Sequence, residues 1–88
     1  MLRDCELDAN GALVFPSAEL GDRTTVLTNG VIAPYLPVAA RKYRFRLVNS
    51  ALERTFRLTL GGATLTQIGS DGGLLPAPKQ RSEIILAW

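Results

Sequence analysis

Residues 43–48 read Tyr-Arg-Phe-Arg-Leu-Val, and this stretch decides the fold class. In an extended chain Tyr43, Phe45 and Leu47 fall on one side, while Arg44 and Arg46 fall on the other. This period of two is typical of a strand that buries one face and exposes the other. We therefore predict a strand here whose aromatic and aliphatic side chains enter a core.

Similar β-type runs surround this stretch and are separated by turn residues. Residues 56–60 repeat the alternation, which favours an antiparallel neighbour for residues 43–48. Strands are also predicted at residues 3–8, 12–15, 24–28, 63–68 and 83–88, with turns at the two Asn-Gly pairs and at residues 69–73. The first two runs form a hairpin in this prediction. No window of ten or more residues has apolar positions at helical spacing, so the prediction is an all-β Greek-key sandwich or barrel.

Prolines set the expectations for two irregular stretches. Residues 31–38 contain two prolines, which cannot donate to a sheet ladder. We expect this stretch on the surface or at a sheet edge, with Tyr35 and Leu36 tucked inward. Pro76, Pro78 and the polar residues after them predict an exposed connector before the last strand.

Length and composition point to one small globular domain spanning residues 1–88. An 88-residue chain has room for a single core, and such a core is marginal unless a partner covers part of it. The 47% hydrophobic and 20% charged content is that of a globular protein. A formal charge of +2 is too small to indicate a nucleic-acid or membrane-surface partner, and no apolar run reaches the roughly 20 residues that cross a bilayer.

The inventory of metal-binding and catalytic side chains is short. The sequence contains no histidine, one cysteine and one methionine. Blue copper requires two imidazoles and a thiolate, and serine or cysteine nucleophiles usually require an imidazole base. We therefore predict no catalytic residue and no metal ligand in this chain, and we expect Cys5 to be a buried or half-buried small hydrophobe.

Two longer motifs give the chain a family resemblance. Residues 41–50 read Arg-Lys-Tyr-Arg-Phe-Arg-Leu-Val-Asn-Ser, and residues 67–76 read Gln-Ile-Gly-Ser-Asp-Gly-Gly-Leu-Leu-Pro. Their order and spacing resemble the second plastocyanin-like domain of three-domain multicopper oxidases. This group includes bacterial and spore-coat laccases, bilirubin oxidase and copper-less cell-division relatives. The resemblance extends over almost the whole chain.

The resemblance implies a cupredoxin-like fold and a role inside a larger parent. The parent family couples copper-dependent oxidation of a reducing substrate to reduction of O2 to water, and its middle domain carries no copper. The chain would then be an inactive spacer domain with flanking cupredoxin domains as partners. Family members are often exported or lie on the spore or cell surface. The family's middle domain usually continues past Leu86-Ala87-Trp88, so we expect an incomplete fold that lacks its last strands and self-associates.

Candidate site residues fall into two groups, each with a structural and an interdomain interpretation. Arg44 and Arg46, with Arg57, form either a solvated face or a surface that meets the flanking domains. Arg54, which follows Asn49 and a short turn, is expected to donate to backbone carbonyls or to Glu53.

The turn that contains Asp71, Gly72 and Gly73 is the second group. A lone carboxylate in a turn usually hydrogen-bonds its own backbone. The resemblance places this turn near the interdomain region, which implies a positioning role for it.

Two alternatives to the spacer interpretation stay open. One is a free-standing β module that binds a protein or an oligonucleotide through its arginine-rich face. Low net charge and the inward assignment of Tyr43 argue against nucleic acid. The other is a copper-less relative of the family that serves as a scaffold in envelope assembly.

Overall fold

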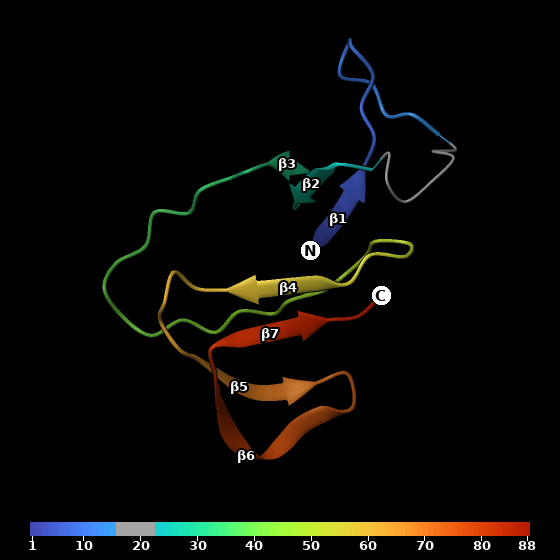
Figure 1. The fold of residues 1–88 in the computed structure, drawn as a ribbon. Helices are drawn as coiled ribbons and strands as arrows, with labels where there is room; N and C mark the ends of the chain where they lie inside the picture. The colour runs from blue at the N-terminus through green and yellow to red at the C-terminus, as the bar shows by residue number, and fades with distance from the viewer. Residues whose placement is uncertain (16–22) are drawn as a thin grey trace. The chain divides into compact units, whose positions relative to one another are not determined.

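The fold of the chain is built from β-strands. A computed structural model describes residues 1–15 and 23–88. Its elements are β1 (Leu2–Cys5), β2 (Thr25–Thr28), β3 (Val31–Ile32), β4 (Phe56–Thr59), β5 (Leu65–Ser70), β6 (Gly73–Arg81) and β7 (Glu83–Leu86) (Figure 1). No helix occurs in these two ranges, and none therefore offers the length and hydropathy needed to span a bilayer. The predicted all-β class is confirmed.

The chain divides into two compact units. The first comprises Met1–Thr55 with Ala87–Trp88, and the second comprises Phe56–Leu86. Strands β1, β2 and β3 belong to the first unit and the four later strands to the second. Each unit is described below by itself.

The first unit contains an antiparallel sheet in the order β1-β2-β3. Leu2 faces Thr28 at one end of the β1–β2 ladder, and β2 turns back into β3 through Asn29 and Gly30. These turn residues have φ values of 50° and 81°. Positive φ at both central residues is the geometry of a tight hairpin turn, which asparagine and glycine adopt readily. The turn predicted from this Asn-Gly pair is confirmed.

The predicted hairpin near the N-terminus also forms, although over fewer residues. Leu7 and Leu13 make an antiparallel bridge, and the amide of Val14 donates to the carbonyl of Glu6 at 3.1 Å. The Asp8 carboxylate closes the turn by accepting from the amides of residues 10 and 12 at 2.8 and 2.9 Å. The start of the predicted strand, β1, is engaged in the ladder with β2.

Residues 43–48 are not a sheet strand, and the prediction of a buried face there is wrong. Tyr43, Phe45 and Leu47 are 42%, 59% and 40% exposed. The ladder contacts of this stretch in the described residues come from Leu2, whose amide donates to the Val48 carbonyl at 2.8 Å. The expected neighbour, β4, pairs with β7. Without a sheet around it, an alternating stretch has nothing to bury its apolar side chains against.

The inward placement of two further side chains is also wrong. Tyr35 is 89% exposed and Leu36 is 68% exposed. Both lie in residues 33–39, which have no strand pairing. The prediction of a surface-lying stretch for this region agrees with the structure, but no core receives its side chains.

The second unit consists of two antiparallel pairs, β4 with β7 and β5 with β6 (Figure 1). Within β4, Phe56 is buried and Leu58 half-buried, whereas Arg57 and Thr59 are exposed. The alternation predicted for residues 56–60 is confirmed over residues 56–59, whereas Leu60, placed on the inward side by the prediction, is 52% exposed. Gly73, with φ of +115°, closes the turn from β5 into β6.

The connector predicted around the prolines is wrong, because residues 76–81 belong to β6. Proline is tolerated in edge strands and at irregularities, where its missing N–H interrupts no continuous ladder. Within the described residues β6 pairs with β5 alone, and the β5–β6 register shifts between Gln67 and Gly69. Pro76 and Pro78 lie between the two paired stretches of β6.

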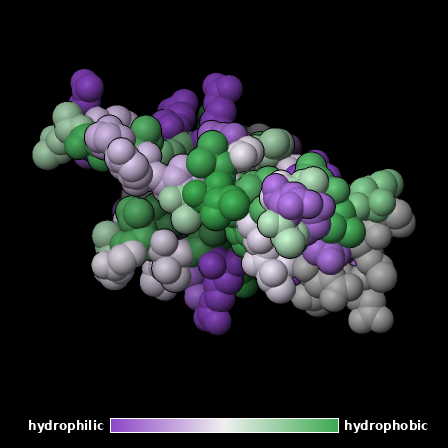
Figure 2. Space-filling model, turned by 90° about the horizontal axis from the view of Figure 1, so that it is seen from above, coloured by the Kyte–Doolittle hydropathy of each residue, from purple (hydrophilic) through white to green (hydrophobic). Residues whose placement is uncertain are grey.

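Few apolar side chains of the described residues are buried. They are Cys5, 5% exposed, in the first unit, and Phe56, 9% exposed, in the second. The burial expected for Cys5 is confirmed. Large apolar side chains such as Phe15, Leu74 and Trp88 are mostly exposed, and Figure 2 shows apolar side chains at the surface among hydrophilic ones. A chain that buries so little apolar surface is only marginally stable by itself.

Candidate functional site

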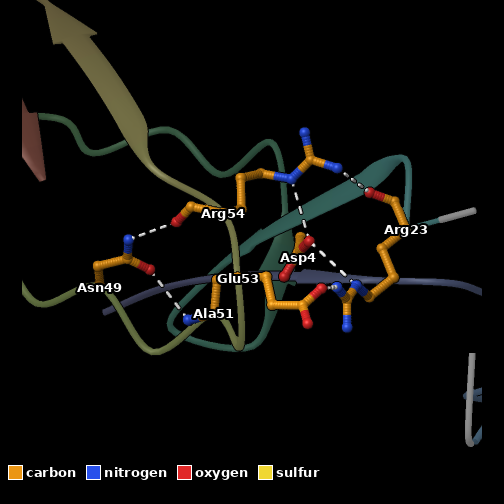
Figure 3. Close-up of polar contacts among 6 residues, drawn as sticks. All are labelled: Asp4, Arg23, Asn49, Ala51, Glu53 and Arg54. Carbon is orange, nitrogen blue, oxygen red and sulfur yellow. Dashed lines mark hydrogen bonds and ion pairs between the residues drawn. The ribbon is translucent and has the colours of Figure 1, made fainter. Parts of the chain in front are cut away.

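The most highly organised side chains of the first unit form a polar group, here called the Asp4 cluster. It consists of Asp4, Arg23, Asn49, Glu53 and Arg54 (Figure 3). Asp4 is in β1, Arg23 precedes β2, and the other three lie in the loop before β4. The cluster therefore joins three stretches of the chain that are far apart in sequence.

The Asp4 carboxylate lies at the centre of the cluster, between two guanidinium groups (Figure 3). Its side chain is 1% exposed. Arg54 Nε donates to Asp4 Oδ2 at 3.0 Å, and Arg23 Nε lies 3.4 Å from the same oxygen. A buried carboxylate is stable only when it is paired and hydrogen-bonded, and these two arginines supply that pairing.

Each arginine makes one further contact, either to a backbone carbonyl or to a second carboxylate. Arg54 Nη2 donates to the carbonyl of Arg23 at 2.9 Å, and Arg23 Nη2 donates to Glu53 Oε2 at 3.0 Å. The cluster then holds two carboxylates and two guanidinium groups, so its formal charge is balanced. Glu53 is the solvent-facing member, with a side chain that is 63% exposed.

Asn49 shapes the loop that presents Arg54. Its Oδ1 accepts from the amide of Ala51 at 2.9 Å, and its Nδ2 donates to the Arg54 carbonyl at 2.7 Å. An asparagine that bonds its own backbone two residues on is a common turn former. The side chain thus fixes both ends of the turn, and the Arg54 guanidinium is directed at Asp4.

The contacts of this cluster hold segments of the backbone together. A balanced group of paired charges offers no unpaired base, and the one thiol nearby, Cys5, has no imidazole in the sequence to activate it. The pairing fixes β1 against the loop at residues 49–54, and a substrate is not needed to explain it.

A separate ion pair lies in the other unit, across β4 and β7. Arg57 Nε donates to Glu83 Oε2, and the two side chains are 71% and 36% exposed. The hydrogen bond from Arg57 lowers the pKa of the Glu83 carboxyl, and the same bond raises the pKa of Arg57. This pair is solvated, so it contributes less to stability than the buried Asp4 pair.

The structure brings some of the sequence-predicted residues together and separates others. Arg54 and Asn49 belong to the Asp4 cluster, whereas Arg44 and Arg46 are exposed in the unpaired stretch. Arg57, grouped with them in the prediction, is paired with Glu83.

The Gly-Ser-Asp-Gly-Gly motif lies in the second unit. Asp71 and Gly72 form the turn between β5 and β6, and Gly73 begins β6. Asp71 and Gly72 are both exposed. An interdomain role for either group stays a prediction.

Sequence reasoning missed Asp4 and Arg23. Asp4 lies in a run of strand-forming residues, and nothing local shows that its carboxylate is buried. Its arginine partner at position 54 is 50 residues away. A buried acid becomes recognisable only after the strand pairing that buries it is known.

The side chains of this chain do not fit copper. Blue copper sites use two imidazoles with a thiolate, and Cu(I) sites use several soft sulfur ligands, whereas the sequence has no imidazole and a single cysteine. Cys5 is buried, and the single methionine is the exposed Met1. No group of three or more histidine, cysteine or acidic side chains suited to a metal occurs within residues 1–15 and 23–88.

Comparison with known proteins shows where such a chain occurs. No family model matches it. The chain is 39% identical to a laccase of Bacillus stratosphericus, a match that covers 99% of the chain and 20% of that laccase. It is 41% identical to the cell division protein FtsP of Edwardsiella tarda, with 99% of the chain and 19% of that protein covered.

A third relative carries the family name itself. The chain is 38% identical to multicopper oxidase LPR1 homolog 1 of Oryza sativa subsp. japonica, over 76% of the chain and 11% of that protein. The chain therefore spans about a fifth or less of the length of these curated relatives. Nearly its whole sequence aligns with laccases at close to 40% identity, and its all-β fold agrees with the expected cupredoxin-like class. By sequence, the chain belongs to the multicopper oxidase family.

Proposed function

We propose that the chain is a non-catalytic structural segment of a multicopper oxidase and corresponds to the middle, copper-free cupredoxin domain. Its task is to space and orient the copper-bearing parts of the parent. The parent would oxidise a reducing substrate with O2 as the electron acceptor. The observation that carries this proposal is the combination of a laccase-like sequence with a complete lack of histidine.

The geometry supports a spacing role. The Asp4 cluster fixes three distant stretches of the first unit with buried, charge-balanced contacts, which is how a rigid support is built. The many exposed apolar side chains require cover, and flanking domains of a longer parent would supply it. On this proposal the flanking cupredoxin domains are the partners of the chain.

Metal analysis of the purified chain tests the copper-free assignment. The chain is incubated with Cu(I) and, separately, with Cu(II), dialysed, and measured by elemental analysis and visible absorption. The expected result is far less than one copper per chain and no blue thiolate-to-copper band, because the chain has no imidazole for a blue site and only one thiol, too few soft ligands to hold Cu(I) tightly. Stoichiometric copper with blue absorption that disappears in Cys5→Ser would overturn the proposal.

A second candidate is a segment of a cell division protein, because the identity to FtsP proteins is as high as that to laccases. The sequence and the function of the parent gene distinguish an oxidase segment from a segment of a cell division protein. Histidine-containing copper motifs in the flanking sequence, with oxidase activity of the full-length protein, favour the oxidase. A division defect on deletion, in a parent without such motifs, favours the cell division role.

A further inference from the structure

The exposed stretch at residues 42–48, here called the basic segment, has the side-chain order of a strand that lacks a partner. It has no strand assignment, and all of its side chains are exposed. Its last carbonyl, that of Val48, already accepts from the amide of Leu2 at 2.8 Å. Ladder bonding begins at this end of the segment and does not continue through it within the described residues.

The basic segment keeps the period of two. The rings of Tyr43 and Phe45 lie side by side, with centroids 6.4 Å apart. Arg41 lies on the same side, since its guanidinium carbon is 5.7 Å from the centre of the Tyr43 ring and its Nε donates to the Tyr43 hydroxyl at 3.2 Å. Contacts between residues two apart place these side chains on one side of an extended backbone.

The opposite row of the basic segment is cationic up to its last member, Val48. Lys42, Arg44 and Arg46 alternate with the aromatic residues and are all exposed. No ion pair joins any of them to a carboxylate in the part of the chain that the structure describes. One row therefore offers an aromatic and aliphatic surface, and the other offers three positive charges at a spacing of two residues.

A second copy of this segment is a poor partner. If two copies pair with their basic rows on the same face, in either parallel or antiparallel orientation, the basic rows lie beside each other. In an antiparallel pair centred on Arg44, Lys42 of one copy lies opposite Arg46 of the other. Like charges directly opposite each other destabilise a strand pair. A shift by one residue would instead place the basic row of one copy beside the apolar row of the other.

The chain has one acidic run at the same spacing, Asp4, Glu6 and Asp8, and two of its three carboxylates are already engaged. Asp4 is buried between Arg23 and Arg54, and Asp8 caps the turn of the first hairpin. Glu53 and Glu83 are paired with Arg23 and Arg57.

We propose that the basic segment binds an extended polypeptide strand in which carboxylate side chains alternate with apolar ones, supplied from outside these 88 residues. The backbone groups of the segment bond to the added strand, the carboxylates lie opposite Lys42, Arg44 and Arg46, and the apolar side chains cover Tyr43 and Phe45. This is strand addition at an open edge, with charge complementarity selecting the strand. The ladder bond already made at Val48 favours a peptide strand over a single-stranded oligonucleotide, whose backbone has no amide groups to continue a ladder.

Peptide binding to the intact 88-residue chain tests the proposal. The probe is a short capped peptide of alternating glutamate and valine, and the matched control peptide has lysine in place of glutamate. The acidic peptide should bind at least about tenfold more tightly, because opposite and like cross-strand charges differ by several tenths of a kcal/mol per pair. Amide exchange should slow within residues 43–48, and added salt should weaken binding.

Charge-reversed chains sharpen the test. The double change Arg44→Glu with Arg46→Glu should reverse the preference toward the lysine peptide, and Lys79→Glu on the exposed face of β6 should leave it unchanged. If the double variant does not fold, the proposal is tested by the unaltered chain, through its preference between the two peptides and the salt dependence of its binding. The proposal is overturned if neither peptide binds, if both bind equally, or if the protection maps elsewhere.

Two rival occupants give distinct results. Tighter binding of a short oligothymidylate than of the acidic peptide would replace the proposal with nucleic-acid recognition. Protection of residues 43–48 in a peptide-free dimer would replace it with self-pairing. Neither result would bear on the copper-free assignment, which depends on the missing imidazoles and is measured separately.

Discussion

Arg54 Nε donates to Asp4 Oδ2 at 3.0 Å across 50 positions of sequence, and the carboxylate that accepts this bond is almost completely buried. Asp4→Asn removes the charge between two arginines and leaves them facing each other. Breaking a buried pair typically lowers stability by about 3 kcal/mol. Urea unfolding followed by far-ultraviolet circular dichroism should therefore show a large loss of the folded fraction in this variant.

Asp71→Asn provides the matched control, since Asp71 lies in the exposed β5–β6 turn. It removes the same charge from the surface and should shift the unfolding midpoint only slightly. Equal destabilisation by the two changes would show that the Asp4 cluster is not an important contributor to stability.

The Arg57–Glu83 pair predicts a dependence on acid. The hydrogen bond from Arg57 lowers the pKa of Glu83 in the folded chain. The contribution of Glu83 to stability is then complete above the ordinary glutamate pKa of about 4.3 and is lost as the pH falls through the lowered value. Carbon-detected NMR titration of the Glu83 carboxyl measures this directly.

The variant Arg57→Gln tests whether Arg57 is the cause of the lowered pKa of Glu83. Without the guanidinium, the pKa of Glu83 should return toward its ordinary value, and the acid-sensitive part of stability should shrink. An unchanged titration curve for Glu83 in this variant would contradict the assignment to Arg57.

Two adjacent glycines in the β5–β6 turn should respond differently to substitution. Gly73 has φ of +115°, a conformation that side chains with a Cβ rarely adopt, whereas Gly72 has no positive φ and open space around its Cβ position. Gly73→Ala should destabilise the hairpin by about 1–3 kcal/mol, and Gly72→Ala by far less. Thermal unfolding of the two variants makes the comparison, and equal effects would argue against backbone strain.

The exposed apolar surface predicts self-association of the isolated chain. Phe15, Tyr35, Leu74 and Trp88 are each more than 70% exposed. Burial of apolar area between copies is favourable by about 25 cal/mol per Å². Size-exclusion chromatography with light scattering should therefore show a mass that rises with concentration. A constant monomer mass over a wide concentration range would contradict this expectation.

Local chemistry could be predicted from the sequence, and long-range pairing could not. The Asn29-Gly30 turn and the alternation in β4 depend on adjacent residues, and both are confirmed. The choice of β7 as the partner of β4, and of Arg54 as the partner of Asp4, depends on residues far along the chain.

The basic segment shows the same distinction most clearly. Its residues carry the alternation of a half-buried strand, but burial also requires a neighbouring sheet. Alternation is a property of the residues themselves, whereas exposure is a property of what surrounds them. The sequence of residues 43–48 therefore predicts a strand whose neighbouring strand is absent from the described residues.

The two prolines of β6 have a consequence for ordered aggregation. A fibril grows when the backbone of one molecule templates the next through an unbroken row of amide hydrogens. Pro76 and Pro78 have no amide hydrogen to offer, and residues two apart in a strand present their backbone groups to the same edge, so one edge of the middle of β6 is a poor template. β6 is the longest strand in the described part of the chain, and along that edge its composition works against stacking of further molecules.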